Sequence, residues 1–436
     1  MLCGCKILKV KTKIMLKQLN YIYDTYINKR MLILLALGFT SGFPFLLVFG
    51  TLSFWLKDLD ISYSLIGAFS LVKIPYSLKW AWSPLIDNVK LPILYKMGRR
   101  RSWAVFIQIL LFCSLTAIAF SNPEQHTLHT ALFAFIASFL SASQDIVLDA
   151  YRVESFENEP EKQASGVAMY VLGYRLGLIF SGAGAIYMAS VLSWTEVYVI
   201  MAFGLLVGFT AILLAKEPQK YHYKSYKLKL KDGAAFIKNS LVNPFKDFAK
   251  RQHWYWILLF IFTYRLSNAY FGPMSFPFYV DLGFSKAEIA SVIKIYGMVA
   301  AIVGGLVGGL IVMKLGLKNS LLLFGLTQCL TTFLFAVQAQ CGHNMPLFIL
   351  IITLENFSSG LATTALVAYI SSLCNKLYTA TQYALLSSVM SLSRDIFSST
   401  SGLLAQYVSW NVFFIICGFL SLPSLIIVWF CLKKDK

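Results

Sequence analysis

The stretch Ser138–Arg152, which reads S-F-L-S-A-S-Q-D-I-V-L-D-A-Y-R, places two carboxylates, Asp145 and Asp149, near the end of an apolar run. The run is long enough to cross a bilayer as a helix, and the four-residue spacing puts both carboxylates on one face. An ionisable residue at the centre of a membrane helix costs about 2.5–3.5 kcal/mol, so it should line a protein or water cavity and is a candidate for function. The alternative, for Asp149 above all, is a place at the cytoplasmic rim beside Arg152.

The composition of the whole chain is that of a membrane protein. Its 436 residues are 58% hydrophobic and 13% charged, with a mean hydropathy of +0.67. The apolar residues occur in runs of about 20 or more, the length that crosses a bilayer, which excludes a soluble multi-domain protein. The net charge of +18 does not indicate a nucleic-acid partner, because the bases lie between apolar runs and not on one face of a soluble domain.

Twelve apolar runs separated by polar breaks predict an all-α integral membrane protein with 12 transmembrane helices. The first run follows a basic segment without the pattern of a signal peptide, so we expect it to be retained as a span. The predicted spans are 31–56, 62–86, 103–121, 129–149, 165–189, 194–215, 254–280, 286–313, 319–340, 346–371, 380–405 and 409–432.

The connections between these runs alternate sharply in charge. One set holds thirty Lys and Arg residues, whereas the other holds only Lys57 and Lys286. By the positive-inside rule we expect both termini and the long central loop to face the cytoplasm. The chain then divides into a cytoplasmic N-terminal segment, a six-helix bundle, a basic cytoplasmic linker, a second six-helix bundle and a short tail, at 1–30, 31–215, 216–253, 254–432 and 433–436.

The two bundles look like copies of one unit, because matching motifs recur in the same order at a constant offset. G-R-R-R-S at 98–102 matches G-L-K-N-S at 316–320, and at the same offset the pair A-Y at 150–151 recurs at 368–369. Arg175 and Arg394 fall one residue from the same alignment. Two pseudo-symmetric six-helix bundles in parallel orientation are the major facilitator fold, which binds its solute near the midplane and works by rocking of the bundles.

The charges inside the predicted spans favour cations. An excess of buried cations is costly unless an anion arrives, which points to an anionic or carboxylate-bearing solute. Proton coupling needs a carboxylate beside a cation, and Asp145 with Arg175, or Glu355 with a cation of the facing half, are the candidate pairs. The cations are Lys73, Lys79, Arg175, Arg265, Lys294 and Arg394, and the acids are Asp145, Asp149, Glu355 and Asp395.

Some of these residues have simpler interpretations. Lys73 and Lys79 could extend to a membrane interface, and Arg175 could pair with Asp145 or Asp149 as a structural clamp. The sequence carries no nucleophile with its base and no phosphate-binding loop. Its five histidines and eight cysteines lack the spacing of metal ligands. We therefore predict a monomeric secondary transporter, not an enzyme, with no catalytic residue, metal or cofactor, whose partners are a small solute, protons and the lipid bilayer.

Eight motifs spread over nearly all of the spans resemble one known family. They are G-F-T-S-G-F-P at 38–44, I-G-A-F-S-L-V at 66–72, K-W-A-W-S-P-L-I-D at 79–87, G-R-R-R-S-W at 98–103, S-A-S-Q-D-I-V-L-D-A-Y at 141–151, V-L-G-Y-R-L-G at 171–177, L-E-N at 354–356 and C-N-K-L-Y-T-A-T-Q-Y-A-L-L-S at 374–387. Together they resemble the AmpG-type muropeptide permeases of the major facilitator superfamily.

This resemblance implies proton-driven import of anhydromuropeptides, which are fragments of cell-wall peptidoglycan, from the periplasm across the bacterial inner membrane. The residues that match charged or amide positions of the family are Gln144, Asp145, Asp149, Lys79, Arg175, Lys294, Glu355 and Arg394. We also expect a cytoplasmic gate motif at Asp87, Gly98, Arg99, Arg100 and Arg101.

The chain departs from the family pattern at three places. Lys73 stands where the pattern has glycine, and Asn268, in R-L-S-N-A at 265–269, replaces the carboxylate of K-L-G-D-A. Longer members also continue into further hydrophobic segments after the twelfth span. A divergent paralogue that carries another anionic solute, such as an acyl-CoA-like cofactor or a sugar-peptide, is therefore an alternative, since eukaryotic acetyl-CoA carriers resemble this family too. A non-transporting membrane sensor of the same fold is another.

Overall fold

The computed structural model describes residues 23–62, 65, 69–156, 159–218 and 242–431, apart from the side chains of residues 70, 286, 294 and 431. This part of the chain is helical and contains no strand. Most of the predicted basic linker, the predicted tail and the segment before Tyr23 lie outside it. We call residues 23–218 the N-terminal half and residues 242–431 the C-terminal half.

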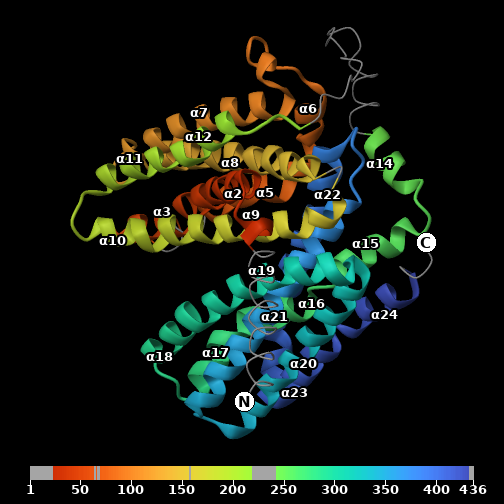
Figure 1. Cartoon of the computed structure of the whole chain (residues 1–436). Helices are drawn as coiled ribbons and strands as arrows, with labels where there is room; N and C mark the ends of the chain where they lie inside the picture. The colour runs from red at the N-terminus through yellow and green to blue at the C-terminus, as the bar shows by residue number, and fades with distance from the viewer. Residues whose placement is uncertain (1–22, 63–64, 66–68, 157–158, 219–241, 432–436) are drawn as a thin grey trace, which may run out of the picture.

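Helices of the N-terminal half form the upper body of Figure 1. Pro44 lies inside the first of them, which ends at Val48, and the following helix continues the same span. Its helices are α2 (Lys29–Val48), α3 (Gly50–Asp58), α5 (Ile74–Leu78), α6 (Ser83–Asn88), α7 (Arg99–Ala119), α8 (Thr127–Ser155), α9 (Gln163–Ile179), α10 (Ala185–Ala189), α11 (Trp194–Gly204) and α12 (Leu206–Leu214).

Apart from α14, which is drawn at the level of the upper body, helices of the C-terminal half form the lower body, and α22 extends from it to lie against α6 and α8 of the upper body (Figure 1). Its helices are α14 (Asn243–Ala249), α15 (Trp254–Thr263), α16 (Leu266–Phe271), α17 (Ser275–Asp281), α18 (Lys286–Ser291), α19 (Met298–Leu315), α20 (Leu317–Cys341), α21 (Met345–Ser372), α22 (Thr379–Tyr407), α23 (Trp410–Phe419) and α24 (Leu422–Cys431).

The two bodies meet at one end and separate at the other. The start of α7, with Arg99, Arg100 and Arg101, and the end of α8, with Arg152, lie at the end where α22 contacts α6 and α8, and we call this the basic end. Helices α9 and α19 also pack together across the boundary between the halves. At the opposite end α10 and α18 lie well apart (Figure 1).

Nine of the twelve predicted spans are confirmed, within the described residues, as continuous helices long and apolar enough to cross a membrane. The described residues of the span at 62–86, and the span at 254–280, form several short helices. The span at 380–405 is one long helix, α22, but serine and threonine make it too polar for that criterion. Because α22 packs against the other half and borders a cavity, its polarity follows from facing protein and solute, not lipid.

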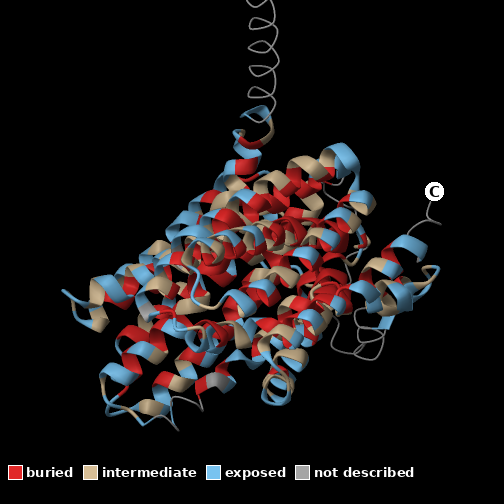
Figure 2. Cartoon of the chain, turned by 90° about the horizontal axis from the view of Figure 1, so that it is seen from below, coloured by how far each residue is buried: buried red, intermediate tan, exposed pale blue. Residues whose placement is uncertain are grey.

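The outer faces of both halves are apolar. Large hydrophobic side chains such as Phe203, Leu206, Trp429 and Phe430 are exposed, as expected where lipid tails replace water. Buried residues run through the interior of the molecule and exposed ones along its periphery (Figure 2).

The predicted duplication is visible in the structure. Gly98 and Gly316 both have positive φ, +107° and +77°, and each directly precedes a helix, α7 or α20. The starts of α8 and α21 are separated along the chain by the same offset as these two glycines. A tryptophan–aspartate hydrogen bond of 2.9 Å also occurs once in each half, Trp194 to Asp58 and Trp410 to Asp281. Two pseudo-symmetric bundles therefore form the fold, as the sequence predicts.

Candidate functional site

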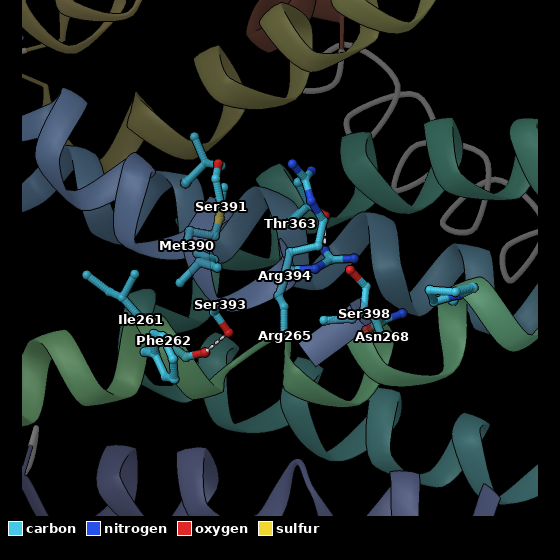
Figure 3. A pocket seen from close by; sticks show the side chains of 15 residues that line it. Ile261, Phe262, Arg265, Asn268, Thr363, Met390, Ser391, Ser393, Arg394 and Ser398 are labelled. Atoms are coloured by element: carbon cyan, nitrogen blue, oxygen red, sulfur yellow. Dashed lines mark hydrogen bonds between the residues drawn. The ribbon is translucent and has the colours of Figure 1, made fainter. Parts of the chain in front are cut away.

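A cavity of about 450 Å³ opens in the C-terminal half, between α15, α16, α21 and α22 (Figure 3). The break between α15 and α16, at Arg265, turns that side chain towards it. Apolar side chains form one part of its wall and hydroxyl, amide and guanidinium groups the other. The polar lining residues are Arg265, Asn268, Thr363, Ser391, Ser393, Arg394 and Ser398, and the apolar ones include Ile261, Phe262, Leu366, Val367 and Met390.

Arg265 is held firmly by its neighbours on α21. Its Nη1 donates to the carbonyl oxygen of Ser359 at 3.2 Å and to Oγ1 of Thr363, and its Nη2 donates to Oγ of Ser359 at 2.9 Å. Three hydrogen bonds to one helix fix the plane of the guanidinium group. Arg265 is therefore an immobile positive charge in the cavity wall.

Arg394 is different, because its side chain is 68% exposed. Its single contact among the described residues is Nε to Oδ1 of the adjacent Asp395 at 3.4 Å, and that carboxylate is itself 55% exposed. An exposed ion pair at this distance is weak. The guanidinium group of Arg394 is thus available to a solute, as the predicted role in the cavity requires.

Glu355 is the buried carboxylate of this region, with 8% exposure. Its Oε1 accepts a hydrogen bond of 2.8 Å from Nδ2 of Asn268. It lies close enough to Arg265, and to Arg175 of the N-terminal half, for their charges to interact. The amide at residue 268, a departure from the family pattern, thus donates a hydrogen bond to an acid. The pairing of Glu355 with Arg175, a cation of the opposite half, stays a prediction.

Asp145 has different neighbours from those expected. Its Oδ1 accepts a hydrogen bond of 2.6 Å from Ser41 of α2, and the cation whose charge acts on it most is Lys79. Arg175 makes no hydrogen bond or ion pair with it among the described residues, and its charge interacts with Glu355 instead. The anticipated pair of Asp145 with Arg175 is therefore replaced by Asp145 with Ser41 and Lys79.

Asp149 lies at the basic end beside Arg152, the alternative that the sequence left open. Nη2 of Arg152 donates to Oδ1 of Asp149 at 3.3 Å, and Nη1 donates to Oγ of Ser371 in the C-terminal half at 3.0 Å. The Arg152 side chain is fully buried, with the rings of Tyr170 and Tyr383 5.5 Å and 5.2 Å from its Cζ. Sequence reasoning did not select Arg152 as a site residue, because Ser371 and Tyr383 belong to the other half of the chain.

Three other predicted residues lie outside the cavity of Figure 3. Gln144 is fully buried and donates from Nε2 to the carbonyl oxygen of Thr40 at 2.8 Å, so it joins α8 to α2. Lys73 is exposed, and its Nζ lies 5.3 Å from the ring centre of Phe49. Lys294 occupies a π-helical turn before α19, and its side chain is among those not described.

The predicted gate residues form a buried network at the basic end. Asp87 accepts hydrogen bonds from the backbone N–H and Oγ1 of Thr381, at 2.8 Å and 2.7 Å, and so binds the N-terminus of α22 across the boundary between the halves. Arg100 donates to Asp87 at 2.7 Å and to Glu154 at 2.6 Å, and Arg99 donates to Glu154 at 2.9 Å. Burial raises the pKa of Asp87, but Arg100, Arg99 and the hydrogen bonds from Arg100 and Thr381 outweigh it and hold that pKa below its ordinary value.

Gly98 and Arg101 complete this network beside the start of the central loop. Glu217 accepts hydrogen bonds from the backbone N–H groups of Arg100 and Arg101 at 2.7 Å and 3.1 Å, and burial raises its pKa. A Cβ at Gly98 would lie 2.3 Å from Cδ of Glu217, and the φ of +107° also favours glycine. Nη2 of Arg101 donates to the carbonyl oxygen of Leu213 at 2.8 Å.

Two helical halves, charges that interact across them, and one closed end are the features of a membrane transporter of the major facilitator class. The sequence model of the Major Facilitator Superfamily matches residues 34–394 and 257–436. The fold is similar to that of the proton:xylose symporter XylE, with a TM-score of 0.68 at 13% identity, covering 93% of this chain and 96% of XylE. A bacterial homologue of the iron transporter ferroportin, in an outward-facing state, gives 0.66 at 15% identity, covering 93% and 100%.

Curated relatives narrow the family further. The protein named AmpG 4 in Rickettsia felis is 38% identical over 410 residues, covering 93% of this chain and 97% of its own. The anhydromuropeptide permease of Escherichia coli is 35% identical over 404 residues, covering 92% of this chain and 79% of the permease. The chain belongs to the AmpG-type permease family of the major facilitator superfamily.

Proposed function

We propose that this chain imports anhydromuropeptides from the periplasm into the bacterial cytoplasm by proton-coupled alternating access. The observation that carries the proposal is the cationic cavity region, where Arg265 and Arg394 line the wall and Arg175 lies near Glu355. Cations without matching anions favour a carboxylate-bearing solute, and anhydromuropeptides carry carboxylates. The name of the E. coli relative supports the same solute.

The direction of transport rests on the charge of the loops. By the positive-inside rule, the basic end is the cytoplasmic end, and both termini lie on that side. The network around Asp87 and the contact of Arg152 with Ser371 then close the cytoplasmic side. The cavity would face the periplasm, from which the solute enters.

Glu355 and Asp145 are the residues that we propose for proton coupling. Each is a carboxylate in a predicted span with one polar neighbour that donates a hydrogen bond, Asn268 or Ser41, and each lies within reach of a cation's charge. Gain of a proton would weaken the attraction of Glu355 for Arg175 and Arg265, which belong to different halves. Protonation could in this way change the balance between the two conformations.

The test is uptake of labelled anhydromuropeptide into vesicles that contain the purified protein, with an imposed inward proton gradient. We expect accumulation above the outside concentration, abolished by an uncoupler. Absence of gradient-dependent accumulation, while a control permease works in the same vesicles, would contradict the proposal without touching the fold. Asp145→Asn should lose accumulation but keep solute exchange, and unchanged accumulation would remove Asp145 from the coupling role.

Asn268 favours a second candidate, a related carrier for another anionic solute. The amide replaces a carboxylate of the family pattern and contacts Glu355 directly, so the charge of the cavity differs from that of the pattern. An acyl-CoA-like solute would suit the remaining cations. Competition of labelled muropeptide uptake by an excess of acetyl-CoA separates the two, whereas binding of a solute without any uptake would favour a non-transporting membrane sensor of the same fold.

A further inference from the structure

We propose that Arg175 and Arg394, one from each half, form a two-sided clamp for the carboxylate groups of the solute, while Arg265 is a fixed positive charge in the cavity wall. This inference rests on the proposed function. It assigns different roles to three arginines that the sequence alone treats alike.

The first step is the difference in their hydrogen bonds. Arg265 uses three of its five N–H donors, two of Nη1 and one of Nη2, on Ser359 and Thr363. Arg394 has only the weak contact of its Nε with Asp395, and Arg175 makes no hydrogen bond or ion pair among the described residues. A guanidinium group with free donors is the group that binds a carboxylate through two parallel hydrogen bonds.

The second step is their placement across the boundary between the halves. Arg175 is on α9 and Arg394 is on α22. The charge of Arg265 interacts with the charges of both arginines. Arg265 and Arg394 project from neighbouring helices into the same cavity (Figure 3). Arg265 and Arg394 thus line one cavity, and Arg175, which is not one of its lining residues, lies within reach of the charge of Arg265 from the facing half.

The third step is the charge balance of that region. Among the described residues, the region holds three guanidinium groups but only two carboxylates. These are Glu355, which is buried, and Asp395, which is exposed and adjacent to Arg394. Asp145 and Lys79 of the N-terminal half interact with each other. Closing the open end would therefore bring like charges together unless an anion enters, because repulsion strengthens as water leaves. A solute carboxylate supplies that anion, and closure becomes dependent on solute.

A matched pair of solutes tests the clamp in the full-length protein. Binding is measured by titration calorimetry in detergent for an anhydromuropeptide with free peptide carboxylates and for the same compound with those carboxylates amidated. For the wild type we expect the acid to bind about 10- to 100-fold more tightly than the amide, the range of a charge-assisted hydrogen bond. In Arg394→Gln and Arg175→Gln this ratio should fall below about 3-fold.

Controls separate the clamp from folding and from the proposed function. Lys314→Gln, at an exposed cation of the basic end, should keep the wild-type ratio, and Arg394→Lys should restore part of it. An unchanged ratio in both glutamine variants, or equal binding of the two solutes by the wild type, would overturn the clamp while muropeptide transport stands. Binding of neither solute by the wild type would overturn both proposals. A fall of the ratio in Arg265→Gln alone would transfer the binding role to Arg265 and contradict the assignment.

Discussion

Nη1 of Arg152 in α8 donates a hydrogen bond of 3.0 Å to Oγ of Ser371 in α21. A fully buried cation of the N-terminal half is therefore hydrogen-bonded to a hydroxyl group of the C-terminal half. Tyr170 and Tyr383 cover the same guanidinium group from α9 and α22. These contacts can exist only while the basic end is closed. Arg152 therefore stabilises one of the two conformations that a rocking transporter must visit.

Arg152→Gln should shift the protein towards the state that is open at the basic end. Loss of a charged hydrogen bond removes about 1.5–3 kcal/mol, which changes the ratio of the two states by about 10- to 100-fold. The measurement is labelling of a cysteine placed at Ser165, fully buried beside Gly309 at the boundary, by an impermeant maleimide added from the basic side. Labelling should accelerate in Arg152→Gln, in a background without native cysteines.

Arg30 provides the control for this experiment. It makes an ion pair of 2.9 Å with Glu159, but both side chains are partly exposed, at 44% and 29%. An exposed pair contributes about 0–1 kcal/mol, so Arg30→Gln should label at nearly the wild-type rate. Equal acceleration in both variants would show that Arg152 has no special role in closure.

Asp87→Asn should also open the basic end, because the carboxylate binds Arg100 and the N-terminus of α22 at once. Its partners hold the pKa of Asp87 below the ordinary value of about 3.9. Because the pKa of Asp87 is lower in the folded protein than in the unfolded chain, its carboxylate stabilises the folded protein fully at any pH above the unfolded-state pKa. This stabilisation is lost only as the pH falls through the folded-state pKa. Cysteine labelling at position 165 should thus accelerate in Asp87→Asn. The ratio of the Asp87→Asn rate to the wild-type rate, in which the pH dependence of the thiol cancels, should be the same at about pH 8 and about pH 5.

Asp60→Asn is the matched control, since Asp60 is 96% exposed and, within the described part of the chain, pairs only with Lys57 at 3.6 Å. It should leave the labelling rate unchanged. If Asp87→Asn also labels like the wild type, the link between Asp87 and α22 does not determine which end is closed.

The fold could be predicted from the sequence because a bilayer determines both the length and the polarity of a membrane-spanning segment. The three spans that fail a strict test of length and polarity, at 62–86, 254–280 and 380–405, are broken or polar. Hydropathy is weakest there, because side chains that face a cavity need not be apolar. The internal repeat was readable because Gly98 and Gly316 both need a backbone conformation that favours glycine.

The interaction partners of the charged residues could not be predicted from the sequence. Asp145 and Asp149 share one face of α8, yet one bonds Ser41 near the middle of the fold and the other bonds Arg152 near the basic end. Four residues on a helix span about 6 Å, enough to separate a cavity from a gate. Arg175 interacts with Glu355 and not with the nearer acids in sequence, because the two halves face each other only after folding.

Gly309→Ala should impair closure of the basic end. A Cβ at residue 309 would lie 2.6 Å from the hydroxyl oxygen of Tyr26 and 3.1 Å from Cα of Ser165, both in the N-terminal half. That hydroxyl also donates to the carbonyl oxygen of Leu306 at 2.5 Å. We expect uptake to fall several-fold, because the added methyl forces the halves apart only in the closed state.

Gly305→Ala makes the same change one helical turn away and serves as its control. The nearest atom to a Cβ there is Oγ1 of Thr364, at 3.5 Å, an ordinary contact. Uptake should stay near the wild-type rate. A similar loss in both variants would indicate a general intolerance of α19 to side chains and not a specific block of closure.

Glu355→Gln should separate solute binding from proton-driven accumulation. The amide keeps the shape of the side chain and a hydrogen-bond acceptor for Asn268, but it removes the negative charge that Arg175 and Arg265 experience. We expect exchange of labelled solute across the membrane to persist, whereas accumulation against a gradient falls to the level seen with an uncoupler. Asp395→Asn removes a carboxylate that is 55% exposed and should retain accumulation. Accumulation that survives in Glu355→Gln but disappears in Asp145→Asn would assign coupling to α8, on the opposite side of the boundary, and would leave Glu355 as a counter-charge for the arginines of the cavity.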